Sequence, residues 1–359
     1  MRGLLEQSGI EVSLPEVDGE RCAHALMEFS DCRACVDACP QEAWVLDDEA
    51  LGLDTEACDG CALCVPACPR GAISSELPVE SLVYRGRRLA LLACERTGLE
   101  GAGLVPCIHS VGLAHLLELY RQGVRTLLYA HGDCSDCDRA KGGCSLPMAI
   151  QRLQSLLDDR RLAPLKAQAY APGAWRSRRD LLLRSGLRNA GADMSRRAFL
   201  RGAAGEAVER TLRTTGIALP AIGSGEGRSL DEILPPRGGR ALYPAAPRID
   251  GGQCDACHAC ARICPDGAIV FEAEDNTYRI APGRCSDCGL CVSVCERDAV
   301  SVAKWTEAEP EQRIALVQSR CRACGAPFWQ VLEGADAERT LCSICTRTNH
   351  QARLYQVLE

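Results

Sequence analysis

The chain has few aromatic residues, no long apolar run and no excess of positive charge. Its 359 residues include only four Phe, four Trp and seven Tyr, so we expect bound metal to replace part of the usual aromatic core. No apolar segment approaches the ~20 residues of a membrane-spanning helix. The 48 acidic and 41 basic residues give a formal charge of −7, which does not favour nucleic acid as a partner.

Two kinds of motif are also missing. Residues 1–12 carry Arg2, Glu6 and Glu11 and lack the apolar stretch of a secretion signal, so we expect a cytoplasmic location. No GxGxxG follows a predicted strand, and the sequence has no Walker motif. The sequence therefore indicates no nicotinamide, flavin or nucleotide site.

Cysteine, by contrast, is abundant. The chain holds 25 cysteines, most of them in CxxC spacings. The alternative to metal binding is a disulfide scaffold, which is typical of small secreted domains. The length of the chain and the ligand-like spacings favour metal binding in a reducing compartment.

Two complete CxxCxxCxxxC runs lie between residues 254 and 295. This is the bacterial-type ferredoxin pattern for two [4Fe–4S] clusters, in which the fourth cysteine of each run ligates the cluster of the other run. One predicted ligand set is Cys254, Cys257, Cys260 and Cys295, and the other is Cys285, Cys288, Cys291 and Cys264.

The pattern repeats near the N-terminus with one departure. The later run there is complete, but the earlier run has Phe29 in place of its leading cysteine, and Cys22 is predicted to supply the missing ligand over a longer loop. Without Cys22, that site could hold a three-iron cluster or use a solvent or carboxylate ligand. The predicted sets are Cys22, Cys32, Cys35 and Cys68 for one cubane, and Cys58, Cys61, Cys64 and Cys39 for the other.

The middle of the chain has the pattern of a β-α-β unit. Residues 89–93 are a continuous apolar run that predicts a buried strand, residues 124–130 predict a second buried strand, and residues 111–121 have the periodicity of a helix between them. This order predicts a parallel sheet with a site at its carboxyl edge. Five cysteines fall at that edge, with Cys107 ranked just behind the other four as a ligand: Cys94, Cys134, Cys137, Cys144 and Cys107.

Residues 86–165 resemble the small iron–sulfur subunit of methyl-viologen-reducing hydrogenase. The resemblance implies a [2Fe–2S] cluster and delivery of electrons to a heterodisulfide reductase. The family usually has another cysteine where this chain has Ala130 and His131, so a [4Fe–4S] cluster or zinc also stays open. The residues that carry the resemblance are Leu91–Cys94, Val105–Cys107, Gly123 and Gly132–Cys134.

An Arg-rich segment, then a Gly- and Pro-rich one, follows the middle domain. A solvated helix face is the simplest interpretation of the arginines, and a docking surface for an acidic partner is the alternative. Residues 195–200 match the twin-arginine export motif, but they are far from the N-terminus and charged residues follow them, so we do not expect export. Residues 194–304 resemble the cytoplasmic ferredoxin-type accessory protein of periplasmic nitrate reductase.

Two CxxC knuckles near the C-terminus complete the cysteine pattern. They consist of Cys321, Cys324, Cys342 and Cys345. Four thiolates at these spacings predict a structural zinc ribbon. A rubredoxin-like iron site has the same ligands, but Thr346 stands where a second glycine would follow, which favours zinc.

These patterns predict an α+β and α/β multidomain chain. It would contain two ferredoxin-like dicluster modules, a central parallel α/β domain and a C-terminal zinc ribbon. The expected divisions are 1–85 for the first module, 86–170 for the α/β domain, 171–247 for the linker, 248–306 for the second module and 307–359 for the zinc-ribbon-like tail.

The expected function is electron transfer without substrate chemistry of its own. The chain would carry four [4Fe–4S] clusters, an additional central cluster and zinc. It would relay electrons between another carrier and a redox enzyme such as a formate dehydrogenase, a hydrogenase or a heterodisulfide-reductase-like complex. The main alternative is an accessory protein that matures a molybdoenzyme. Thiol or disulfide chemistry at His131, Cys134 and Cys137 is a third interpretation.

Overall fold

A computed structural model describes residues 14–46, 51–75, 77–142, 146–192, 229–236, 238–332 and 339–348. The chain divides into two compact units, residues 1–28 with 33–221 and residues 29–32 with 222–359. Cys144 and the export-like motif at 195–200 lie outside the described residues. Within the described ranges, no helix is long and apolar enough to cross a membrane.

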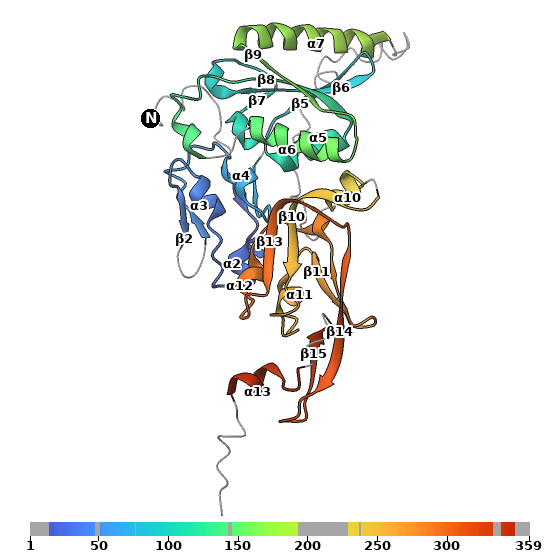
Figure 1. Cartoon of the computed structure of the whole chain (residues 1–359). Coiled ribbons are helices and arrows are strands. Elements are labelled where there is room, and N and C mark those ends of the chain that lie inside the picture. Colours follow the sequence, from blue (N-terminus) through green and yellow to red (C-terminus); the bar gives the residue numbers. More distant parts are fainter. Residues whose placement is uncertain are drawn as a thin grey trace, which may run out of the picture. The chain divides into compact units, whose positions relative to one another are not determined.

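The first unit begins with a small module built from two similar halves (Figure 1). In each half a short helix that follows the cysteine loop leads into a short strand, and the strands form the two-stranded sheets β1–β4 and β2–β3. Trp44 and Ile73 from these strands are buried with Cys35 and Cys64. The elements are β1 Glu16–Val17, α2 Ala23–Leu26, α3 Ala34–Ala38, β2 Trp44–Leu46, β3 Leu51–Leu53, α4 Cys64–Ala67 and β4 Ile73–Ser74.

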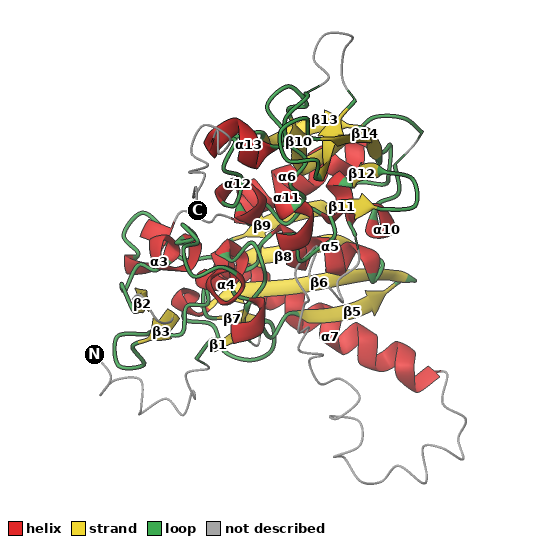
Figure 2. Ribbon diagram, turned by 90° about the horizontal axis from the view of Figure 1, so that it is seen from below, coloured by secondary structure: helices red, strands yellow, loops and turns green. Residues whose placement is uncertain are grey.

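The same unit continues into an α/β domain whose strands lie side by side in Figure 2. The sheet order is β5-β6-β8-β9, with the short β7 paired to β6. Strands β7, β8 and β9 run parallel to their neighbours, as the β-α-β pattern predicts, and β5 is antiparallel. The elements are β5 Glu80–Tyr84, β6 Arg87–Cys94, β7 Leu104–Val105, α5 Leu113–Arg121, β8 Val124–Ala130, α6 Leu146–Asp159, β9 Lys166–Tyr170 and α7 Pro172–Ala192.

Helix α7 covers the opposite face of this sheet from α5 and α6 (Figure 1). Trp175 and Leu182, one heptad apart, are buried against the sheet, and the Trp175 indole donates a hydrogen bond to the Leu128 carbonyl at 3.1 Å. Arg179 is buried as well and donates to the Glu100 carbonyl at 2.7 Å. The α/β domain therefore extends past residue 170, where the sequence places the start of a linker, because this helix has an apolar face.

The second unit contains a long two-stranded ribbon and a four-stranded antiparallel sheet. The ribbon pairs β10 with β13, and the sheet order is β11-β12-β14-β15. Residues 241–247, which the sequence places in the linker, belong to β10 because buried Ala241, Tyr243 and Ala245 alternate along it. The elements are α10 Leu230–Ile233, β10 Ala241–Ile249, α11 Ala259–Ile263, β11 Ile269–Glu272, β12 Thr277–Ile280, α12 Leu290–Ser293, β13 Val300–Ala308, β14 Gln312–Arg320, β15 Pro327–Val331 and α13 Ser343–Thr348.

Candidate metal centres

The second unit brings the first predicted ligand set to one pocket. Cys254, Cys257, Cys260 and Cys295 all line it, so the fourth cysteine of the later run lies with the first three of the earlier run. Burial raises the pKa of the Cys254, Cys257 and Cys260 thiols, to about 12 at Cys260. A cationic metal centre would supply the positive charge that such buried thiolates need.

The other set in this unit forms a matching group. The charges of Cys264 and Cys288 both act on Cys285 and Cys291, which places the four sulfurs near one another. Burial raises the pKa of Cys291 to about 12. A side-chain hydrogen bond also connects the two cysteine runs: the Ser286 hydroxyl donates to the carboxylate of buried Asp266 at 2.5 Å.

The first unit repeats this arrangement around Cys64. Burial, together with the neighbouring charges of Cys58, Cys39 and Cys35, raises the pKa of Cys64 to about 12. Cys61 is buried too, and burial raises its pKa. The fourth cysteine of the earlier run, Cys39, thus lies beside the later run, as the ferredoxin pattern requires.

A repeated turn follows the last cysteine of every run. The sulfur accepts a hydrogen bond at 3.3 Å from the backbone N–H four residues later, and the residue before that N–H has a left-handed φ between 51° and 65°. Hydrogen bonds to cluster sulfurs are one of the features that set a cluster potential. The sulfur and N–H pairs are Cys39 with Ala43, Cys68 with Ala72, Cys264 with Ala268 and Cys295 with Ala299.

We expect Gly71→Val to destabilise the first module. Gly71 has a φ of 56° at this turn, and a β-branched residue held there costs about 1–3 kcal/mol of folding free energy. The measurement is the denaturation midpoint of the anaerobic, metal-loaded chain. Gly173→Ala is the control, because a Cβ at Gly173 meets open space. Equal midpoints for both variants would contradict the turn argument.

The incomplete run differs from the complete ones in backbone as well as in sequence. In each complete run the residues two and four after the leading cysteine have positive φ. At Arg33, four residues after Phe29, φ is −125°, and the Phe29 side chain is 71% exposed. The positive-φ pairs of the complete runs are Gly60 and Ala62, Ala256 and His258, and Asp287 and Gly289.

Cys22 is held close to the segment that carries Cys68. Arg21 donates to the Arg70 carbonyl at 3.4 Å and Arg70 donates to the Arg21 carbonyl at 3.3 Å. Asp18 N also donates to the Ala72 carbonyl at 2.7 Å. These contacts fit the use of Cys22 in a set with Cys68. Cys32 is grouped with the second unit, and its role as a ligand stays a prediction.

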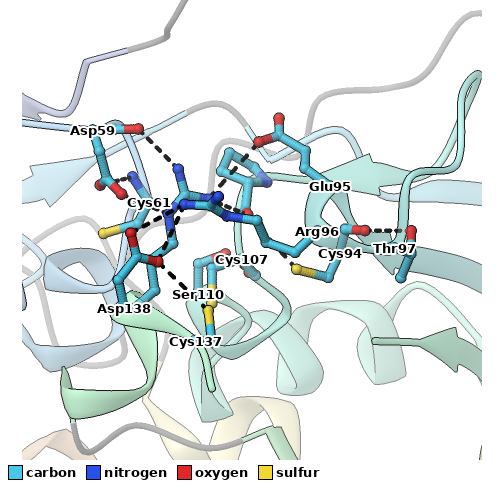
Figure 3. Close-up of polar contacts among 12 residues, drawn as sticks. Asp59, Cys61, Cys94, Glu95, Arg96, Thr97, Cys107, Ser110, Cys137 and Asp138 are labelled. Atoms are coloured by element: carbon cyan, nitrogen blue, oxygen red, sulfur yellow. Dashed lines mark hydrogen bonds and ion pairs between the residues drawn. The ribbon is translucent and has the colours of Figure 1, made fainter. Parts of the chain in front are cut away.

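The carboxyl edge of the α/β sheet brings together four of its five predicted cysteines. Cys94, Cys107, Cys134 and Cys137 line one pocket, and Figure 3 shows three of them close together. Cys94 ends β6, Cys107 follows β7, and the other two lie in the loop after β8. Cys144, the fifth, lies outside the described residues, so its place in the set is untested.

His109 is a member of this pocket that the sequence pattern does not reveal. Its Nδ1 accepts a hydrogen bond from Leu146 N at 3.1 Å, so the neutral ring carries its proton on Nε2. That nitrogen lies 3.5 Å from the Cys134 sulfur and donates to it. Burial lowers the pKa of His109, which favours this neutral form.

The C-terminal knuckles form a tighter group. Among the described residues, Cys321, Cys324, Cys342 and Cys345 are the set whose ligand atoms all lie within 4.8 Å of one another. A tetrahedral zinc with bonds of about 2.3 Å to sulfur requires sulfurs about 3.8 Å apart, and those of Cys324 and Cys342 are 3.8 Å apart. The group therefore has the size of a single-ion site.

This group of four cysteines is connected to the second dicluster module by strand β14 and by the loop before α13. Cys321 directly follows β14, which pairs with β12 of the sheet. In addition, the Arg339 guanidinium donates to the carbonyl of Cys254. The segment after residue 307, which the sequence places in a separate tail, thus shares the sheet of the second module.

Comparison with known families matches two parts of the chain. A 4Fe-4S dicluster domain model matches residues 253–299, and a second 4Fe-4S dicluster domain model matches residues 30–73. No curated protein and no solved structure matches the chain. The two ferredoxin-type domains account for four [4Fe–4S] clusters in total and indicate iron–sulfur electron transfer. The likenesses to a hydrogenase subunit and to a nitrate reductase accessory protein stay predictions.

Proposed function

We propose that this chain is an electron-relay subunit of a redox complex. Its clusters would pass electrons between another carrier and an enzyme of the formate dehydrogenase, hydrogenase or heterodisulfide-reductase-like kind. The observation that carries the proposal is the presence of two dicluster domains and a further cysteine site in one chain. When bound, a [4Fe–4S] cluster takes up and releases one electron at a time, and the protein sets the potential at which it does so.

The residues of the chain would perform three tasks in this role. The eight cysteines of each module hold the clusters, and Phe271, Tyr278 and Trp329 pack around His258 beside one of the sites. The backbone turns after each run donate hydrogen bonds to ligand sulfurs. Cys257 is exposed, which would leave one cluster edge open to a partner.

Purification with native partners under anaerobic conditions tests the relay role. A subunit is expected to co-purify in stoichiometric amount with an active enzyme, and the clusters are expected to be reduced by the substrate of that enzyme. The alternative, a cytoplasmic accessory protein for a molybdoenzyme, predicts binding only to the cofactor-free form of the partner. The exposed Arg176, Arg178 and Arg184 of α7 offer a basic surface for either kind of partner.

The C-terminal group of four cysteines is proposed to bind one structural zinc. We expect about one zinc per chain by elemental analysis, and Cys345→Ala is expected to lose it because a three-cysteine site binds zinc far more weakly. Ser343→Ala, on the same helix and not a predicted ligand, is the control and should keep it. Iron with a rubredoxin-like spectrum at this site would contradict zinc.

A further inference from the structure

The α/β domain packs directly on one cluster loop of the first module. Cys61, Leu63 and Cys107 form a buried cluster, so a predicted cubane ligand and a central-site cysteine share one apolar contact (Figure 3). A Cβ at Gly112, which precedes α5, would lie 2.5 Å from the Cβ of Pro66 in α4. The two parts therefore approach each other closely along this face.

One buried arginine connects the two cysteine sites. The Arg139 side chain is 6% exposed and pairs with the Asp59 carboxylate at 2.6 Å. It also donates to the Asp59 carbonyl at 3.1 Å and to the Pro106 carbonyl at 2.5 Å. Asp59 lies between Cys58 and Cys61, and Pro106 precedes Cys107.

The Arg139 guanidinium also lies near the segment that carries Cys94, another cysteine of the central site. Its Nη1 atom lies 3.8 Å from the Glu95 carboxylate, and Glu95 directly follows Cys94. Arg139 thus contacts segments that carry cysteines of both sites.

On these contacts, we propose that the central site exchanges electrons directly with the cubane of Cys58, Cys61, Cys64 and Cys39, and that Arg139 is the positioning residue for this exchange. This inference rests on the proposed function. Each event moves one electron from one cluster to the other, so that the donor is oxidised by one and the acceptor reduced by one, and no bond forms or breaks.

Electron paramagnetic resonance of the fully reduced, full-length chain tests the connection. Two reduced clusters in close contact broaden or split each other's signals. At the signal of the central cluster, we expect this interaction in the native chain, its loss in Cys58→Ala, and its persistence in Cys22→Ala, which affects the other cubane. Iron analysis is the check that each variant keeps its remaining clusters. An interaction that survives Cys58→Ala but is lost in Cys22→Ala would overturn the proposal.

Arg139→Gln tests the positioning role without removing a ligand. Loss of the buried charge is expected to shift the reduction equilibria of both clusters toward the oxidised form by about tenfold. Arg96→Gln is the matched control, because Arg96 lines the central pocket but pairs with Asp138 at the surface. It is expected to change the central site alone.

The outcomes separate this inference from the relay function. Zinc in place of iron at the central site would overturn the inference, as would independent signals from two reducible clusters, and in either case the relay function would stand. A chain without reducible clusters would instead refute the relay function. A potential shift in Arg139→Gln confined to one cluster would also overturn the positioning role.

Discussion

Replacing Cys295 by alanine is expected to remove the cubane that Cys254, Cys257 and Cys260 hold. The cubane of the run that contains Cys295 itself should stay. Cys295 lines the pocket of Cys254, Cys257 and Cys260, and a cubane bound by three thiolates is lost or reduced to three irons. The chain should therefore lose about one to four of about 16 cubane irons. Anaerobic iron and sulfide analysis gives this count, and alanine is used because serine could still ligate.

Double variants give the crossed connection a sharper test. If Cys295 and Cys254 serve one cluster, then Cys295→Ala with Cys254→Ala loses no more iron than either single variant. Cys295→Ala with Cys285→Ala, in contrast, should lose about twice as much iron as Cys295→Ala alone, because two clusters are affected. The reverse result would show that each run holds its own cluster.

Replacing Cys22 by alanine is expected to remove or shrink one cubane of the first module and leave the other unchanged. The contacts between Arg21 and Arg70 hold Cys22 beside the Cys68 segment, and Phe29, at the usual ligand position, cannot bind iron. Loss of one to four irons per chain should accompany a change in the paramagnetic spectrum.

The control for this variant is Leu26→Ala in the helix that follows Cys22. Leu26 is 38% exposed, so its truncation should leave both the iron content and the spectrum as they are. Unchanged iron and spectrum in Cys22→Ala would show that Cys22 is not a ligand. The solvent or carboxylate alternative would then apply to that site.

The cysteine spacings alone predict both ferredoxin-type domains. Short loops determine how a run wraps a cluster, so local sequence is sufficient there, and the domain matches at 30–73 and 253–299 agree. The apolar run at 89–93 and the strand pattern at 124–130 similarly predict the parallel strands β6 and β8. Local patterns of this kind depend on neighbours a few residues away.

Features that depend on distant contacts were not predictable in the same way. Arg139 and Asp59 are 80 residues apart in the chain, and nothing in the spacing of either links them. The arginine content of residues 176–201 predicts a solvated helix face. Trp175 and Leu182, whose burial holds helix α7 on the sheet, meet their partners only in the fold. His109 lies too far in sequence from Cys134 to be read as its hydrogen-bond donor.

Anaerobic metal analysis of the full-length chain tests the electron-relay function most directly. Four cubanes require about 16 irons with an equal amount of acid-labile sulfide, and a central cluster adds about two to four more. Reduction should give paramagnetic signals from several interacting clusters. A count near eight irons, or iron that no reductant changes, would contradict a multi-cluster relay.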